Sequence, residues 1–208
     1  SYPIYEPDRL ALLELARMGL MVGVTIPNQG VAIPANGLGG GIGVIRPAAA
    51  PQNEWRVSHI TRSATRGTTP LSVDTLALAF TDSSFLYLAT LHLAGNGLFG
   101  NFDNFANKLL PNLTEITFAS NNITNIDGLV QASTGRGWTT ASFSSNNISS
   151  IPSALLEEFH SLREVGFDDN QLTALPAPQS VCSVSVAGIG LNMTCPCYGG
   201  LDGLYYIL

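Results

Sequence analysis

A unit of apolar and polar positions repeats four times along the middle of the chain. In each copy the first, fourth, sixth and eleventh residues are apolar and the ninth is asparagine. The copies are Leu88–Leu98, Leu113–Ile123, Trp138–Ile148 and Leu162–Leu172. Their asparagines, Asn96, Asn121, Asn146 and Asn170, lie 25, 25 and 24 residues apart. A fixed period of this length predicts a repeat architecture in which each copy builds one structural turn.

The pattern within a copy predicts one short parallel strand. Its apolar side chains point into the molecule, and the intervening side chains point outward onto a concave sheet. The asparagine after each strand carries an amide donor and a carbonyl acceptor. One such side chain can therefore bond backbone groups of its own turn and of the neighbouring turn. We expect the four asparagines to form a ladder along the stack.

The unit resembles the leucine-rich repeat. The third and fourth copies continue as Ile148–Pro152 and Leu172–Pro176, as in the typical extracellular repeat. The first copy continues as Leu98–Phe102, which is closer to the plant-type repeat. A degenerate fifth copy, Val181–Leu191, has Ile189 in place of the asparagine. The set is therefore mixed, with four clear repeats and one degenerate repeat.

This resemblance implies an α/β fold, a short right-handed solenoid with a parallel concave sheet. It assigns residues 71–191 to the repeats, residues 1–70 to an N-terminal cap and a Gly/Pro-rich apolar arm, and residues 192–208 to a C-terminal cap and tail. The segment Ser153–Phe159 is expected to form a helical turn on the convex side.

The start of the chain predicts a helix that Asp8 caps and that ends at Met18, with Gly19 as the stop. Leu10, Leu13 and Arg17 share one face of this helix. The segment resembles the N-terminal cap helix of plant and protist leucine-rich-repeat proteins, and Trp55 corresponds to a later tryptophan of that cap. The cysteine pair of the plant cap is absent.

Three apolar runs follow the helix, at Val22–Ile26, Gly30–Ile33 and Gly41–Ile45, and predict short strands. The arm can fold back as a cap, or it can pair with a sheet edge of the next subunit. The pattern alone leaves both readings open. The candidate self-association residues of the arm and of the chain end are Val22, Val24, Ile26, Val31, Ile33, Ile42, Val44, Ile45, Leu204, Tyr205, Tyr206, Ile207 and Leu208.

The three cysteines, Cys182, Cys195 and Cys197, cluster near the end of the chain, which favours an oxidising compartment. Cys195 and Cys197 resemble the C-x-C of an extracellular C-terminal cap. This resemblance implies a disulfide between Cys182 and either Cys195 or Cys197. A zinc site is the alternative, but three thiolates without a nearby histidine are one ligand short of a tetrahedral site. We predict neither a metal nor a cofactor.

Charged residues make up 12% of the chain and the mean hydropathy is +0.23, so glycans or partner subunits are expected to cover part of the surface. Four sequons predict N-glycosylation, at Asn112, Asn122, Asn147 and Asn192. The net charge of −6 opposes a nucleic-acid partner. No apolar stretch is long enough to span a membrane. Ser1 begins neither a signal peptide nor a Met start, so we expect a processed chain, located outside the cell or on its surface.

Candidate catalytic chemistry is sparse. The histidines His59, His92 and His160 stand apart in the sequence, and Asp168 and Asp169 fit a solvated strand end. The residues expected on the outer face of the sheet are Ala89, Thr90, His92, Ala94, Thr114, Glu115, Thr117, Ala119, Thr139, Thr140, Ser142, Ser144, Arg163, Glu164 and Asp168. Of these, only Arg163 is a typical binding hot-spot residue.

A flat face of this kind suits packing against a neighbouring chain, O-linked sugar or ordered water. The sequence thus predicts a protein without catalytic activity that works through protein contacts, chiefly by assembling with copies of itself into a layer or fibre. The alternative is a recognition module for a foreign protein or glycan.

Overall fold

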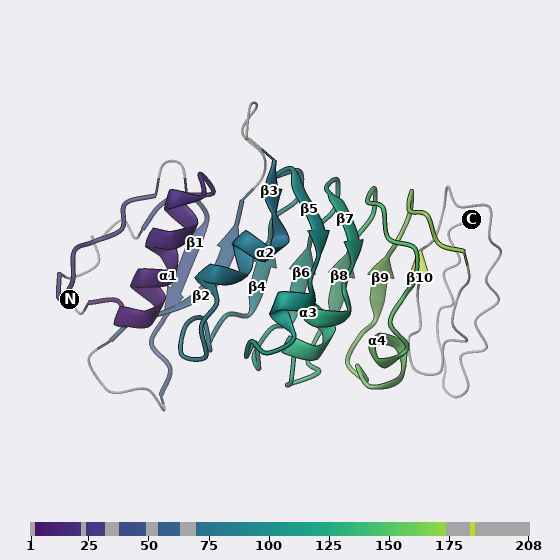
Figure 1. Ribbon diagram of the computed structural model, residues 1–208. Helices are drawn as coiled ribbons and strands as arrows, with labels where there is room; N and C mark the ends of the chain where they lie inside the picture. The colour runs from purple at the N-terminus through teal and green to yellow at the C-terminus, as the bar shows by residue number, and fades with distance from the viewer. Residues whose placement is uncertain are drawn as a thin grey trace.

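The computed structural model describes residues 3–21, 24–31, 38–48, 54–62, 70–173 and 184–185. In this part of the chain, the strands and helical segments follow one another along a single axis, and the helical segments lie on one side of a long row of strands (Figure 1). The described residues include no helix with the length and apolar character needed to cross a bilayer.

One long sheet runs through the molecule. Its strands, in spatial order, are β1 (Ile42–Ile45), β2 (Arg56–Thr61), β4 (Thr90–His92), β6 (Glu115–Thr117), β8 (Thr140–Ser142), β9 (Glu164–Gly166) and β10 (Val184–Ser185). β1 is antiparallel to β2, and all later neighbours are parallel. The register aligns Leu91, Ile116, Ala141 and Val165. This arrangement is that of an α/β solenoid-like fold with a mostly parallel sheet.

A second, short parallel sheet was not predicted. It consists of β3 (Leu71–Ser72), β5 (Leu98–Asn101) and β7 (Asn122–Asn125). β5 lies where the sequence resembles the plant-type repeat. β7 is largely polar, so it lacks the pattern of apolar residues that would predict a strand.

The helical segments are short after the first one. They are α1 (Glu6–Arg17), α2 (Val73–Leu76), η1 (Ala77–Ala79), η2 (Asp103–Phe105), α3 (Asp127–Ala132) and α4 (Ser153–Glu157). α4 falls within the segment expected to form a helical turn. In α3, Gly128 packs so closely on the backbone carbonyl of Phe102 that there is no room for a Cβ atom.

Aromatic rings form a continuous line through the core. Phe85, Phe80, Phe105, Phe102, Phe118, Phe143 and Phe167 contact one another in that order, with ring centroids 5.0–6.4 Å apart. Trp138 is fully buried and packs against Phe143 and Phe159. Because each turn contributes at least one ring, the core is continuous from turn to turn.

The described part of the arm folds back onto its own chain. β1 pairs with β2, and Ile42 is buried in the core, while Val24, Ile26 and Val44 pack against that core. Val31 and Ile45 are exposed. Residues 24–26 and 30–31 form no strand, so the expected strands at Val22–Ile26 and Gly30–Ile33 are wrong for these residues.

The local geometry of the arm explains this difference. Pro27 has no N–H to donate to a ladder, and Gly30 has a φ of 73°, which is incompatible with a strand. The other self-association candidates, Val22, Ile33 and residues 204–208, lie outside the described residues.

The expected cap of α1 is also wrong. The helix begins at Glu6, its N-cap is Tyr5, and Asp8 lies inside its first turn. Ala11, Leu12 and Leu15 face the core, whereas Leu10 and Leu13 are exposed. An aspartate before a helical run is the usual local signal of a cap, and this signal is what the sequence offers at Asp8. Its carboxylate instead bonds two distant segments of backbone.

Candidate functional site

Three of the four ladder asparagines make the same contacts one turn after another, and Asn96 shares their donation to the preceding turn. The amide of Asn146 donates to the carbonyls of Phe143, in its own turn, and Phe118, in the preceding turn, both at 2.9 Å. Its Oδ1 accepts the backbone N–H of Ile123 at 3.0 Å. Each side chain thus satisfies buried groups of two turns, and a buried group left unsatisfied costs about 1–3 kcal/mol.

Asn121 and Asn170 repeat this pattern. Their amides donate back to Leu93 and Phe143, and their Oδ1 atoms accept from Leu98 and Ile148, all within 3.0 Å. The amide of Asn96 reaches back to the carbonyl of Arg62 at 2.8 Å. Every rung therefore bonds toward the N-terminal end.

The outer face of the long sheet is poor in free functional groups. The hydroxyls of Thr114 and Thr139 donate to backbone carbonyls of the preceding turn, at 3.1 and 3.2 Å, and Thr90 is buried. The Ser144 hydroxyl donates to the carboxylate of Asp168 at 3.3 Å. Large aromatic side chains are missing from the residues expected on this face, so it offers few anchors for a ligand.

Asp168 and Asp169 follow the end of β9, and Asp169 has a φ of 53°. Among the described residues no group of three His, Cys, Asp or Glu side chains is placed to hold a metal ion. The Nδ1 atom of His59 lies 2.7 Å from the hydroxyl of its neighbour Ser58.

A buried carboxylate joins the N-terminal helix to the sheet. Asp8 is 1% exposed and accepts the backbone N–H groups of Val57, at 2.9 Å, and Phe85, at 2.7 Å. Burial raises the pKa of Asp8, while the two backbone hydrogen bonds and the nearby charge of Arg56 act in the opposite direction. Sequence reasoning missed this role because the partners are 49 and 77 residues away.

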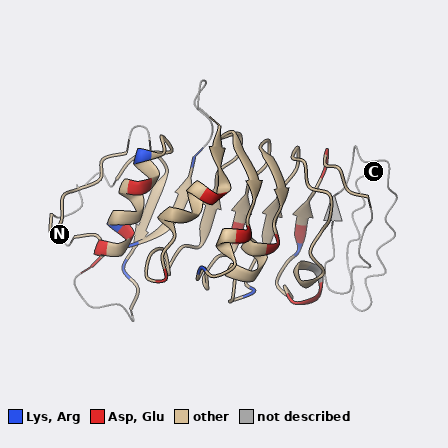
Figure 2. Cartoon of the chain, viewed as in Figure 1, with Lys and Arg blue, Asp and Glu red and all other residues tan. Residues whose placement is uncertain are grey.

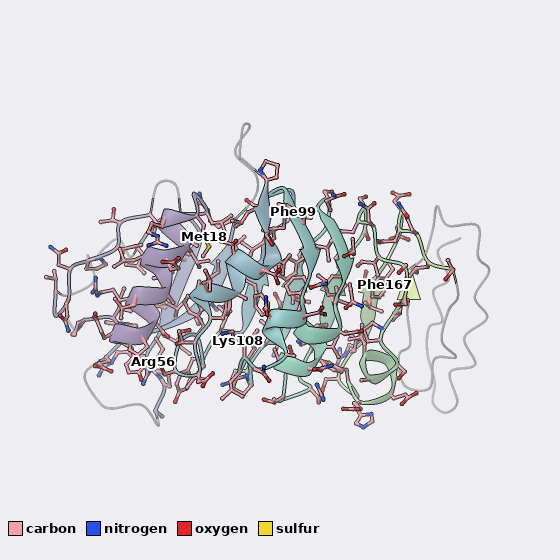
Figure 3. All side chains as sticks on the ribbon, viewed as in Figure 1. Met18, Arg56, Phe99, Lys108 and Phe167 are labelled. Atoms are coloured by element: carbon pink, nitrogen blue, oxygen red, sulfur yellow. The ribbon has the colours of Figure 1, made fainter. Side chains whose placement is uncertain are left out.

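Arg56 lies near the N-terminal end of α1 (Figure 3). Its guanidinium carbon stands 3.2 Å from the ring centroid of Tyr5 and 5.5 Å from that of Tyr87. These cation–π contacts and the buried charge of Asp8 hold α1, β2 and the turn before β4 together. We interpret this cluster as a structural joint.

An apolar groove separates α1 from η1. It has a volume of about 590 Å³ and is lined by Pro7, Leu10, Ala11, Leu13, Glu14, Arg17, Leu78, Ala79, Thr81 and Ser83. The large side chains beside it are unusually open to solvent, with Leu78 65% exposed, Leu10 53% and Leu13 40%. Exposed apolar clusters of this kind mark contact surfaces. The sequence identified the helical leucines as one face, but nothing in it singled out Leu78.

The described sequon asparagines lie at the surface. Asn112 and Asn122 are exposed and Asn147 is half-buried. Asn147 donates to Asn122, and Gln171 donates to Asn147 at 3.2 Å, so these three amides form a second, exposed row. Asn192 and the cysteines Cys182, Cys195 and Cys197 lie outside the described residues.

Comparison with known proteins gives a structural likeness. No protein-family model and no curated protein matches the sequence. Among solved structures, the chain is similar to the leucine-rich-repeat ectodomain of the receptor kinase SOBIR1 from Arabidopsis thaliana, with 20% identity and a TM-score of 0.51. The match covers 86% of this chain and all of that one. The fold is leucine-rich-repeat-like.

Proposed function

We propose that this chain is a non-catalytic, extracellular, N-glycosylated leucine-rich-repeat protein that works by contact with copies of itself, building a layer or fibre. The observation that carries the proposal is the group of exposed leucines, Leu10, Leu13 and Leu78, around the groove beside α1. The low charge of the chain supports it as well, because 12% charged residues keep little of the surface strongly hydrated.

A layer or fibre needs more than one kind of contact, because a single two-fold contact closes into a dimer. Val31 and Ile45 are exposed apolar residues of the arm, 50% and 39% accessible, and β1 is the edge strand of the long sheet. An edge strand presents unpaired backbone groups to a neighbouring chain. The arm therefore supplies a second candidate contact.

Sedimentation velocity over a wide concentration range tests this proposal. We expect the weight-average sedimentation coefficient of the purified chain to rise with concentration, and negative-stain microscopy to reveal extended assemblies at the upper end. A coefficient that stays at the monomer value up to the solubility limit would overturn self-assembly. Treatment with peptide N-glycosidase of protein secreted from eukaryotic cells tests the glycans separately, through the loss of mass.

A second candidate function is recognition of a foreign protein or glycan on the outer face of the long sheet. The charged residues Arg163 and Glu164, both exposed, and the nearby Asp168 favour this function at the C-terminal end of the face. It predicts a ligand whose affinity falls when Arg163 is replaced by alanine, with no change in the sedimentation of the free protein.

A further inference from the structure

The solvent-facing side of α1 carries a pattern that reads the same in both directions, except that the charges exchange sign. A stripe at helical spacing contains Glu6, Leu10, Leu13 and Arg17. Its two leucines are among the most exposed apolar residues described, and the side chain of Arg17 is 78% exposed. The opposite side of the helix is occupied by the core, and the side chain of Glu6, at 32%, is the least exposed member of the stripe. Acidic and basic residues lie along α1 at both ends of the stripe (Figure 2).

This pattern is complementary to itself when two helices pack antiparallel. A two-fold axis midway between Ala11 and Leu12 places Leu10 of one copy opposite Leu13 of the second copy. The same axis places Glu6 opposite Arg17 at both ends, because the residue numbers in each pair add to 23. Apolar side chains then meet in the middle, and opposite charges meet at each end.

A parallel packing does not have this property. It would set Glu6 against Glu6 of the second copy and Arg17 against Arg17, and like charges at such a contact are unfavourable. The charge pattern therefore selects the antiparallel arrangement. It also favours a second copy of this chain over an unrelated partner, since the complementary surface is already present on the molecule.

We propose that the exposed face of α1, with the groove beside it, is the contact between two copies of this chain packed antiparallel around a two-fold axis. This inference rests on the proposed function and names one of its contacts. Leu78 lies across the groove from α1 and adds apolar surface at the edge of the contact. Two-fold pairing through one self-complementary patch is the commonest way in which soluble proteins form dimers.

The ion pairs within each helix are compatible with this contact. Arg9 pairs with Glu6 at 2.6 Å, and Arg17 pairs with Glu14 at 2.9 Å. In the dimer, Glu6 gains a second basic partner in Arg17 of the other copy, while Arg9 and Glu14 flank that pair. A helix of 12 residues is about 18 Å long, so it covers less than the ~800 Å² per partner of a standard interface. We therefore expect reversible association in roughly the micromolar range.

Charge reversal tests the arrangement. Glu6→Arg sets two basic side chains against each other at both ends of an antiparallel pair, and Arg17→Glu sets two acidic ones. Each variant alone is expected to raise the dimer dissociation constant about tenfold or more, measured by sedimentation equilibrium. An equimolar mixture of the two variants restores opposite charges at both ends, so mixed dimers should form with near wild-type affinity.

Two further variants complete the test. Leu13→Asp introduces a charge at the centre of the contact and should abolish dimerisation. Arg163→Glu reverses a basic charge, as Arg17→Glu does, but far from α1, so it should leave dimerisation intact. Leu13, Arg17 and Arg163 are exposed and the side chain of Glu6 is partly exposed, so the far-ultraviolet circular dichroism spectra should match that of the wild type.

Wild-type association that none of the α1 variants weakens would overturn this inference and leave the proposed self-assembly standing on another contact. A wild type that remains monomeric at every concentration would overturn both.

Discussion

The N-terminal end and the repeat stack both have to satisfy buried backbone groups, and they do so in different ways. In the stack, one asparagine per turn satisfies equivalent backbone groups, and most residues expected on the outer face have small hydroxyl or methyl side chains. At the N-terminal end, the single carboxylate of Asp8 joins three segments, and leucines and charges remain exposed on α1. Stability is thus distributed in the stack and concentrated at the end.

This difference suggests that stability and partner contacts depend on different regions of the molecule. A surface built from repeated small residues has few groups with which to select a partner, while a terminal helix can vary without disturbing the period of the stack. We infer that the repeats mainly supply a rigid support and that α1 and the arm supply the contacts.

Removal of the single N-terminal joint should have the largest effect on stability. Asp8→Ala leaves the backbone N–H groups of Val57 and Phe85 without an acceptor and removes a buried carboxylate that interacts with the charge of Arg56. We expect the free energy of unfolding to fall by about 4 kcal/mol, measured by urea denaturation. The control Asp74→Ala removes an exposed carboxylate and should cost less than about 1 kcal/mol. Similar losses of unfolding free energy in both variants would contradict the structural role that we assign to Asp8.

Loss of one ladder asparagine should lower the free energy of unfolding somewhat less than loss of Asp8, because the neighbouring turns keep their own asparagines. Asn146→Ala removes two amide donations and one acceptor from buried backbone groups and should lower the free energy of unfolding by about 3 kcal/mol. Asn147 offers a control one residue away, since its side chain bonds only other side chains at the surface. Asn147→Ala should cost less than about 0.5 kcal/mol in the same thermal or urea unfolding experiment.

The pH dependence of stability distinguishes the end from the stack, because ladder amides do not titrate. A raised pKa means that folded Asp8 holds its proton more tightly than the unfolded chain does. This contribution to stability is complete below the ordinary value of 3.8 and is lost as the pH rises through the raised pKa. The free energy of unfolding of the wild type, measured relative to Asp8→Asn, should therefore increase as the solution is acidified from pH 7. A difference that is constant with pH would show that the pKa of Asp8 is the same in both states.

The smallest expected effect concerns the surface of the stack. Asn122 and Asn147 lie one turn apart with their amides in contact, at a strand spacing of about 4.8 Å. We expect glycans on both asparagines to crowd each other at this spacing. Glycopeptide mass spectrometry of the secreted protein should find only one of the two asparagines occupied in a given molecule. This glycan should leave the thermal stability nearly unchanged. Frequent double occupancy would show that the exposed amide row opens before modification.

The stack was predictable from the sequence for a physical reason. Because every turn has to satisfy equivalent backbone groups, Asn96, Asn121, Asn146 and Asn170 recur at a fixed spacing. The short sheet lacked such a signal, since β7 pairs through its backbone while its side chains are mostly polar.

The N-terminal end was harder to predict, because its contacts occur only once. Asp8 has the local context of a helix cap, and only the folded chain brings Val57 and Phe85 to it. Leu78 lies in an apolar run in which most neighbours are buried, so the geometry of η1 alone leaves it outside. The pattern of the stripe on α1 can be seen in the sequence, but the sequence alone does not show which side of the helix the core covers and which side is exposed.

The uniform direction of the ladder has an evolutionary consequence. Because Asn146 bonds back to Phe118 just as Asn170 bonds back to Phe143, a duplicated copy of one unit would find ready-made partners before and after it. Each added unit would move the two ends apart by about 4.8 Å and leave α1 unaltered. The length of this protein is therefore a trait that gene duplication can adjust in small steps, independently of the exposed face of α1.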